Sequence, residues 1–450
     1  MSKEKLRILI IATGLAILAV PFIFFKTTLA LGLGFLLLYY LIIIIILKPK
    51  LGLFLLIIIR PCLDILTDRM VLAIGGFNLN LASLIGIITL GFGGVLVIKN
   101  RNTLKKVPLI WPIVLFLGIT LGSLFLSMDT KVSLGEFVRL LSMFGLYVLG
   151  YFLIKDKKDF RALIKVIIFS AVIPSIFAVW QFFTKTGISV PLEGVENRIF
   201  GTFAFPTLYA YFLIIPIVLS FYLMLRGDKQ KLSNALAIIL LPVLVFLMAM
   251  TYTRGAWLAL SLILIALGVI KYRKFLMVFL AIILCLYLLV EPINERINSQ
   301  YGSIRWRADT WEQGLGIAKE KIILGHGTGV AEELILKKRG EDFGSADVHN
   351  DYLKILLENG VFGFLAYIFI IFGIFYKLGK KYFKAKGEKE RTLVLIMVCL
   401  AGTLYLISFF SNAIKNTAMQ WTWWVFLGAF FRIYPAPEGP HPIADKKVQD

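Results

Sequence analysis

Charged residues are scarce in this chain of 450 residues: they make up 17% of it, whereas hydrophobic residues make up 59%. A water-soluble protein carries about 25% charged and about 45–50% apolar residues, so this composition excludes a soluble globular domain. Acidic residues are scarcer than basic ones: 27 Asp and Glu stand against 48 Lys and Arg, which gives a formal net charge of +21. In a membrane protein the positions of the charges carry more information than their sum.

Cysteine is rare as well, and its spacing excludes two further classes of protein. Cys62, Cys285 and Cys399 lie far apart, in or beside apolar runs, and form no CxxC pattern. This spacing indicates neither a disulfide framework nor a zinc site. We expect all three to be small residues of an apolar core.

Long apolar runs recur along the whole chain. A helix that crosses a bilayer needs about 20 mostly apolar residues, so the runs predict an all-α, polytopic membrane helix bundle of about 12 to 14 transmembrane helices. Their approximate ranges are 8–25, 28–47, 51–66, 80–98, 108–127, 133–154, 162–183, 207–225, 232–252, 256–270, 275–291, 359–376, 392–411 and 418–433. The first run has no small-residue cleavage site, so we expect it to stay in the mature protein.

The basic residues outside these runs gather in alternate connections, such as residues 99–106, 155–161 and 377–391. The positive-inside rule places such connections in the cytoplasm, and both termini are then cytoplasmic as well. The net charge is therefore a signal of topology and not the footprint of a nucleic-acid partner.

One polar stretch, residues 292–358, is far longer than the few residues that usually join neighbouring helices. The topology places this stretch on the outer side of the membrane, where long structured loops often carry function. It divides the chain into a transmembrane bundle (1–291), an outer loop (292–358), C-terminal transmembrane helices (359–434) and a cytoplasmic tail (435–450).

Two helices are expected within this loop. Residues 306–321 place Trp311, Leu315 and Ala318 on one helical face, and residues 348–360 form an amphipathic pattern that ends at Gly360. We also expect Arg60 and Asp64, spaced i and i+4 at the end of an apolar run, to form a structural ion pair.

Three polar residues of the outer side are candidates for chemistry: Arg198 before a Gly-Thr turn, Arg254 in the segment TYTRGAW, and His349 in DVHNDYLKILLENG. Each has a structural alternative. Arg198 could reach lipid headgroups, Arg254 could cap a helical hairpin, and His349 could be a solvated loop residue. Together, two arginines can hold a diphosphate with charge-assisted hydrogen bonds, and a neutral histidine can take a proton from an attacking hydroxyl. These three residues together could catalyse the transfer of a group from a pyrophosphate leaving group to a hydroxyl.

At these residues the chain resembles the O-antigen ligase and polymerase superfamily of bacterial envelope glycan assembly. His349-Asn350 followed after nine residues by Gly360-Val361-Phe362-Gly363 is similar to the ligase pattern H-[N/S/Q]-x9-G-x-x-G. Thr253-Arg254-Gly255 is similar to the family's Ser/Thr-Arg-Gly segment. The segment from Arg198 to Pro206 resembles R-x-x-G-T-F-x-x-P-N, except that Thr207 stands where the family has Asn.

The resemblance implies a GT-C-like membrane glycosyltransferase of the bacterial inner membrane. Such an enzyme takes a glycan from undecaprenyl pyrophosphate at the periplasmic face and passes it to an acceptor hydroxyl with inversion, without a metal or other cofactor. His349 would be the general base, and Arg198 and Arg254 would bind the pyrophosphate. The leading expectation is an O-antigen ligase that uses lipid A-core oligosaccharide as acceptor. A polymerase, whose acceptor is a second lipid-linked glycan, and a protein oligosaccharyltransferase remain alternatives.

Further residues of the outer loop are weaker candidates. Arg305 fits, with Gly316, an R-x10-G pattern described for the polymerases. Contact with pyrophosphate or sugar is one role for Arg305, Arg307, Trp306 and Trp311, although packing within the loop is the favoured one. His326 lies in a glycine-rich GHGTG turn that could cradle phosphate, and Asp351 is more typical of a helix start.

A transporter or lipid flippase is an alternative of a different class. Transporters place functional polar groups near the bilayer midplane and often show paired, broken helices. The apolar runs carry few ionisable residues, mainly Lys165 and the pair Glu136 and Arg139, and the chain shows no internal repeat. This class is therefore disfavoured.

Overall fold

The computed structural model describes residues 29–66, 71–74, 77–190, 195–226, 232–274, a few positions between 276 and 288, and residues 303–339 and 346–435. The expected run 8–25, nearly all of 275–291 with Cys285, and the tail from 436 lie outside the described residues. The elements are α2 (Leu29–Leu47), α3 (Pro49–Ile59), η1 (Arg60–Cys62), η2 (Asp64–Leu66), β1 (Val71–Ile74), β2 (Phe77–Asn80), α4 (Leu81–Lys99), α5 (Arg101–Leu104), α6 (Ile110–Ser123), η3 (Leu124–Leu126), α7 (Thr130–Leu153), α8 (Lys157–Phe169), α9 (Val172–Thr184), β3 (Ile188–Val190), β4 (Val195–Arg198), α10 (Pro206–Leu225), α11 (Leu232–Met250), α12 (Arg254–Ile270), α15 (Ser303–Glu320), α16 (Ala331–Arg339), α17 (Asp351–Phe383), α18 (Glu388–Phe410), η6 (Ala413–Lys415) and α19 (Thr417–Ile433).

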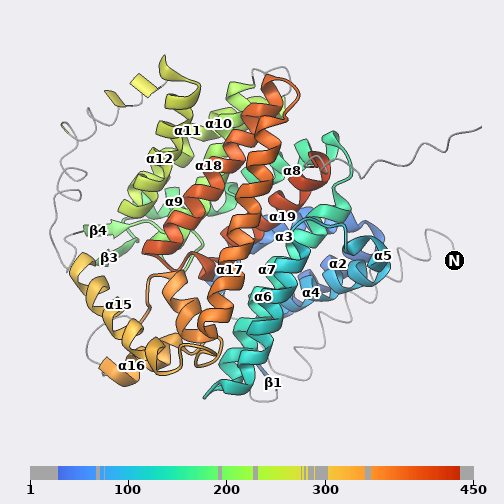
Figure 1. Cartoon of the computed structure of the whole chain (residues 1–450). Helices are drawn as coiled ribbons and strands as arrows, with labels where there is room; N and C mark the ends of the chain where they lie inside the picture. Colours follow the sequence, from blue (N-terminus) through green and yellow to red (C-terminus); the bar gives the residue numbers. More distant parts are fainter. Residues whose placement is uncertain are drawn as a thin grey trace, which may run out of the picture.

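The described chain is an all-α membrane helix bundle, as predicted (Figure 1). Six of its helical stretches are long and apolar enough to cross a membrane: α4, α7, the run from α8 through α9, α10, α17 and α18. Four shorter apolar helices accompany them, within α2, α6 with η3, α11 and α12. Two short antiparallel hairpins, β1–β2 and β3–β4, lie between expected apolar runs and were not predicted.

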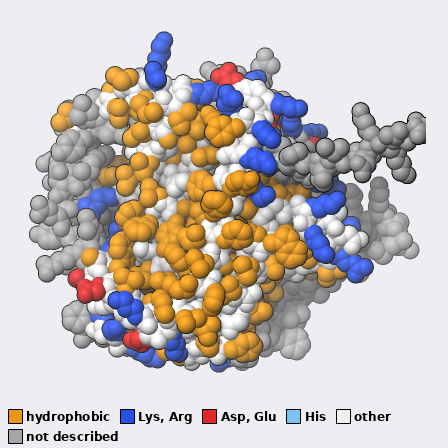
Figure 2. Space-filling view, in the orientation of Figure 1, with side chains coloured by type: hydrophobic (Ala, Val, Ile, Leu, Met, Phe, Trp, Pro, Cys, Tyr) orange, Lys and Arg blue, Asp and Glu red, His pale blue; other side chains and the backbone are white. Residues whose placement is uncertain are grey.

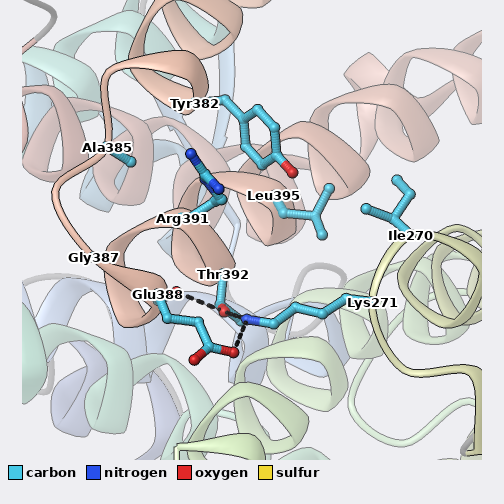
Figure 3. A pocket seen from close by; sticks show the side chains of 9 residues that line it. All are labelled: Ile270, Lys271, Tyr382, Ala385, Gly387, Glu388, Arg391, Thr392 and Leu395. Carbon is cyan, nitrogen blue, oxygen red and sulfur yellow. Dashed lines mark hydrogen bonds and ion pairs between the residues drawn. The ribbon is translucent and has the colours of Figure 1, made fainter.

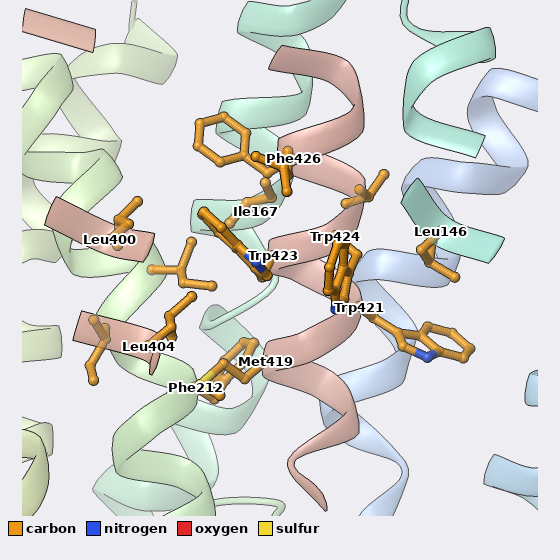
Figure 4. Packing of buried hydrophobic residues seen from close by; sticks show 14 of the residues in the cluster. Leu146, Ile167, Phe212, Leu400, Leu404, Met419, Trp421, Trp423, Trp424 and Phe426 are labelled. Carbon is orange, nitrogen blue, oxygen red and sulfur yellow. The ribbon is translucent and has the colours of Figure 1, made fainter. Parts of the chain in front are cut away.

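The core of the bundle is built around α19, which α7, α8, α10 and α18 surround (Figure 4). Trp421 and Trp423 are almost fully buried there. The indole Nε1 of Trp421 donates to Ser142 Oγ at 3.2 Å, and that of Trp424 donates to Gln420 Oε1 at 3.0 Å. Between helices in a lipid bilayer the hydrophobic effect is weak, so close packing and such hydrogen bonds stabilise the bundle.

The surface of the bundle is apolar. Large side chains such as Val95, Trp111, Ile176, Ile239 and Phe372 are each more than 60% exposed. Hydrophobic side chains cover most of the face in Figure 2, and Lys and Arg side chains gather toward its edges. A continuous apolar surface of this kind belongs in lipid, so the protein is a multi-pass membrane protein. Which side faces the cytoplasm stays a prediction.

The outer loop is structured in its described parts, as expected. Helices α15 and α16 lie at the end of the bundle where α17 begins (Figure 1), and Ile317, Ile335, Val348 and Leu357 belong to a small hydrophobic cluster of their own. The expected face of α15 was partly wrong, because Leu315 is 45% exposed. The helix instead packs against α17 at its glycine: a Cβ on Gly314 would lie 3.2 Å from Leu353 Cδ2.

Two further predictions from the sequence agree with the structure. Arg60 and Asp64 form the expected ion pair, at 2.7 Å between Nη1 and Oδ1. Cys62 and Cys399 are partly buried free thiols, which fits the expectation that they are small packing residues.

Candidate functional site

Arg198 is the last residue of β4, and its side chain is only 7% exposed. Its Nε donates to the backbone oxygen of Thr251 at 2.9 Å, and its Nη2 donates to Thr253 Oγ1 at 3.3 Å. The segment around Arg198 and the segment TYTRG, far apart in the sequence, therefore meet in space. The Arg198 side chain is held against the loop that precedes Arg254 and does not extend to lipid headgroups.

The Gly-Thr turn that follows Arg198 is fixed by one side chain of α9. Gln181 Oε1 accepts from the backbone amides of Phe200 and Gly201 at 2.9 and 2.8 Å, and Gln181 Nε2 donates to the Gly201 oxygen at 2.9 Å. Thr202 Oγ1 donates to the Pro61 oxygen at 2.6 Å. The residues of this motif thus have two roles. Gly201 and Thr202 form the turn, whereas the Arg198 side chain bonds to the loop before α12.

Arg254 is the first residue of α12, and the glycine after it is required by a close approach. A Cβ on Gly255 would run into the hydroxyl of Tyr211, which reaches it from α10. Every other residue type carries a Cβ, so the Tyr211 side chain would have to shift to make room for it. This contact packs the start of α12 against α10, and Arg254 lines a cavity at the same place.

The cavity has a volume of about 490 Å³ and lies between α10, α12, α15 and α18. Its walls are largely apolar, with Leu258, Leu406 and Phe410 among them, and its charged lining residues are Arg254 and Arg307. Among the described residues that line it, none is acidic. An apolar cavity with two cations favours a ligand that has both a negatively charged group and an apolar part.

Helix α15 connects this cavity to His349. Arg307 and Trp311, one helical turn apart, both line the cavity. Trp306 packs edge-on against the His349 ring, with 5.3 Å between ring centroids, and Trp311 Nε1 donates to the Val348 oxygen at 2.9 Å. The Nε of Arg307 is buried, and no acceptor among the described residues bonds to it.

His349 sits in a constrained turn immediately before α17, with a φ of 49°. This left-handed conformation costs energy in a non-glycine residue and is often found at functional sites. Burial, with the nearby Arg307 as a second cause, lowers the pKa of His349 to about 4. The imidazole is therefore neutral at pH 7, the form that can accept a proton.

The turn that carries His349 is anchored on both sides. Asn350 caps α17 by accepting from the Leu353 amide at 3.0 Å, and Asp351 Oδ2 accepts from the Ile414 amide at 3.0 Å. Asp351 is thus a helix-start carboxylate, as expected, and it also binds the segment before α19. One turn further along α17, Lys354 Nζ donates to Glu136 Oε1 on α7 at 2.9 Å.

Glu136 and Arg139, the ionisable pair noted in the sequence, form a partly buried ion pair that includes a 2.8 Å bond between Arg139 Nε and Glu136 Oε2. Lys354 joins the same pair. These charges therefore connect α7 to the base of the outer loop.

Gly360, the first glycine of the G-x-x-G pattern, breaks α17. It has a φ of 63° and a ψ of −168°, values that favour glycine, and a Cβ there would run into the backbone of Ile323. The GHGTG turn packs into this break, because the amides of His326 and Gly327 donate to the oxygens of Leu357 and Glu358 at 3.0 and 2.9 Å. His326 itself is 6% exposed, and its Nε2 lies 2.9 Å from the Ile317 oxygen. The turn caps a broken helix, and His326 has a structural position.

The structure thus brings Arg198, Arg254, His349, Trp306 and Trp311 into one region. The side chain of Arg305 lies outside the described residues. Tyr211 was not predicted from the sequence, and Arg307 was predicted only as a weaker candidate. Tyr211 gave no signal because it lies within an apolar run, whereas the spacing of Arg307 and Trp311 by one helical turn could have indicated a shared face.

The fold and this region define a polytopic membrane protein with a cationic, partly apolar site at one end of its bundle. Comparison with known proteins agrees with the motifs: residues 235–368 match the model of the O-antigen ligase family. An uncharacterized protein of Haemophilus influenzae is 26% identical over 273 aligned positions, which cover 53% of this chain and 63% of that protein. A ComP-specific O-oligosaccharyltransferase of Acinetobacter baylyi is 31% identical over 179 positions, 35% of this chain and 31% of that protein.

The matches therefore span less than two thirds of these relatives' own lengths. They confirm the likeness to the O-antigen ligase superfamily that the motifs predicted. The matched range 235–368 contains Arg254, Arg307 and His349.

Proposed function

We propose that this protein is an O-antigen ligase-type glycan transferase, which moves a glycan from undecaprenyl pyrophosphate to a hydroxyl of lipid A-core oligosaccharide at the periplasmic face of the inner membrane. The observation that carries the proposal is the cavity between α12 and α15. It combines apolar walls, two arginines and a neighbouring neutral histidine. The buried Arg307 Nε, which has no acceptor among the described residues, supports an anionic ligand there.

In this mechanism His349 takes the proton of the acceptor hydroxyl as its oxygen attacks the anomeric carbon of the donor. The bond from that carbon to the pyrophosphate oxygen breaks, its electron pair stays on the pyrophosphate, and the configuration inverts. Arg254, Arg307 and Arg198 stabilise the negative charge that develops on the leaving group. The apolar walls accommodate the first part of the polyprenyl chain.

A pKa of about 4 makes His349 a weak base in the free protein. Negative pyrophosphate beside Arg307 offsets the repulsion that contributes to this low value, so donor binding raises the basicity of the histidine. Proton transfer then becomes favourable only when the donor is in place, which couples binding to catalysis.

Purified protein in lipid nanodiscs, supplied with undecaprenyl-pyrophosphate glycan and lipid A-core, tests this proposal. We expect glycan on the core, and a His349→Ala variant that inserts and folds normally should transfer about 10²- to 10⁴-fold more slowly. Near wild-type transfer by that variant would remove His349 from the mechanism. A growing lipid-linked ladder with donor alone would identify a polymerase and overturn the choice of acceptor.

A second acceptor class has one observation in its favour, the similarity to the ComP-specific O-oligosaccharyltransferase. The same site would serve a protein hydroxyl, because the donor chemistry does not change with the acceptor. Adding an acceptor protein with exposed serine and threonine hydroxyls in place of lipid A-core discriminates between the two. Glycosylation of that protein, with no product on the core, would replace the ligase assignment by a protein oligosaccharyltransferase.

A further inference from the structure

Helices α12 and α18 line two cavities together, one at each end of the pair. Arg254 at the start of α12 and Phe410 at the end of α18 line the cavity described above, whereas Ile270 at the end of α12 and Arg391 near the start of α18 line another. The 17 residues of α12 span about 25 Å at about 1.5 Å per residue, close to the apolar thickness of a bilayer. The two cavities therefore open near opposite faces of the membrane.

The second cavity, shown in Figure 3, has a volume of about 420 Å³ between the ends of α12 and α17 and the start of α18. A smaller cavity of about 160 Å³ shares Lys271, Glu388 and Thr392 with it. A third, of about 420 Å³, lies against the other side of the α17–α18 connection. The basic residues that line the three are Lys157, Arg226, Lys271, Lys381, Lys384, Lys386, Lys389 and Arg391, whereas the acidic ones are Glu388 and Glu390. We call these three the basic cavities.

Both glutamates form ion pairs with lysines. Lys271 Nζ lies 3.1 Å from Glu388 Oε1 and donates to the Thr392 hydroxyl, and Lys381 Nζ lies 2.6 Å from Glu390 Oε1. Arg391 is held differently, with its guanidinium 5.6 Å from the centre of the Tyr382 ring. Among the described residues no carboxylate forms an ion pair with Arg391. The basic cavities therefore have a clear surplus of positive charge.

Apolar surface adjoins this charge. Val269 and Ile270, at the end of α12, are 56% and 55% exposed, and Leu395 lines the larger cavity beside Arg391. A soluble phosphate would contact only the cationic groups. A phospholipid would place its phosphate on the cations and its acyl chains along the exposed apolar end of α12, so it satisfies both features.

We propose that the basic cavities bind the phosphodiester headgroup of an anionic phospholipid from the leaflet opposite to His349. Arg391, Lys271 and Lys389 contact the phosphate, and the acyl chains run past Val269 and Ile270. The lipid joins the ends of α12, α17 and α18, which extend to the candidate active site at their other ends. The site is separate from donor binding, so its occupancy can be measured without any transfer activity.

Native mass spectrometry of delipidated protein titrated with phosphatidylglycerol, phosphatidylcholine or glycerol 3-phosphate tests this. We expect phosphatidylglycerol to bind at least tenfold more tightly than the other two. The double variant Lys271→Gln/Arg391→Gln should weaken it about 25-fold, given about a factor of five for each basic residue near a lipid phosphate. The matched control is Lys105→Gln/Lys106→Gln, which removes the same charge from the connection between α5 and α6 and should change binding less than twofold.

Equal losses in the control variant would overturn the proposal, because general attraction would then explain the binding. Glycerol 3-phosphate that binds as tightly as the lipid would overturn it in favour of a soluble phosphate ligand. If the double variant fails to fold, Lys389→Gln serves instead, since its exposed side chain lines the smaller cavity and is one of the three proposed phosphate contacts. Unchanged phosphatidylglycerol affinity in that variant would also contradict the proposal.

Discussion

The indole Nε1 of Trp311 donates a 2.9 Å hydrogen bond to the backbone oxygen of Val348, the residue before His349. This bond attaches the strained turn of His349 to α15, the helix that also carries Arg307 into the cavity. A single side chain therefore couples the position of the proposed base to that of a proposed pyrophosphate ligand.

Trp311→Phe should lower transfer although it retains an aromatic ring. The change removes one hydrogen bond worth about 1 kcal/mol, and the His349 turn, no longer tied to α15, loses its alignment. We expect kcat to fall about tenfold with little change in melting temperature. Trp111→Phe, at an exposed position on α6, is the matched control and should keep full activity. Equal kcat values in the two variants would show that the bond has no role in alignment.

The low pKa of His349 should appear in the pH profile. The acidic limb of kcat/KM reports the free enzyme, so it should lie near pH 4 and not near the ordinary histidine value of about 6.5. Arg307→Gln removes the positive charge that is the second cause of this shift, so the limb should move to higher pH while the rate falls. Burial remains, so the limb should stay below about 6.5. An acidic limb at an unchanged pH would show that Arg307 does not affect the pKa of His349.

Arg254→Lys should be damaging even though the positive charge is retained. A guanidinium can form two parallel hydrogen bonds to a phosphate group, and an ammonium group cannot. We expect a loss of at least tenfold in kcat/KM with the lipid-linked donor. Arg432→Lys, at an arginine stacked on Tyr151, is the control. Equal transfer by Arg254→Lys and wild type would mean that only the charge matters there.

The sequence predicted the bundle well because apolar runs of about 20 residues have few alternatives to a transmembrane helix. It also predicted the break at Gly360 and the Arg60–Asp64 pair, which depend on local geometry. The hairpin that ends at Arg198 was missed, because its strands are short and lack a clear alternating pattern. The position of Leu315 was wrong, since helical periodicity cannot say which of two adjacent rows of side chains packs against a neighbour.

Of the candidate site, the sequence supplied the motif residues but not the contacts between them. The bonds from Arg198 to Thr251 and Thr253 join segments about 50 residues apart, and no local pattern encodes such a distance. Tyr211 lies in an apolar run, so the sequence did not indicate its contact with Gly255.

That contact between Gly255 and Tyr211 provides a reciprocal test of how the site is built. Gly255→Ala places a methyl group against the Tyr211 hydroxyl, so one of the two must shift, and we expect this shift to displace the neighbouring Arg254. We expect transfer to fall by at least tenfold. Adding Tyr211→Phe removes the opposing oxygen, and the new Cβ then meets only ring carbons, the nearest at 3.4 Å. The double variant should therefore recover much of the activity, measured against Tyr211→Phe alone as the reference. If Gly255→Ala is equally inactive with either residue at position 211, the glycine is required for its backbone or for ligand access and not for this packing contact.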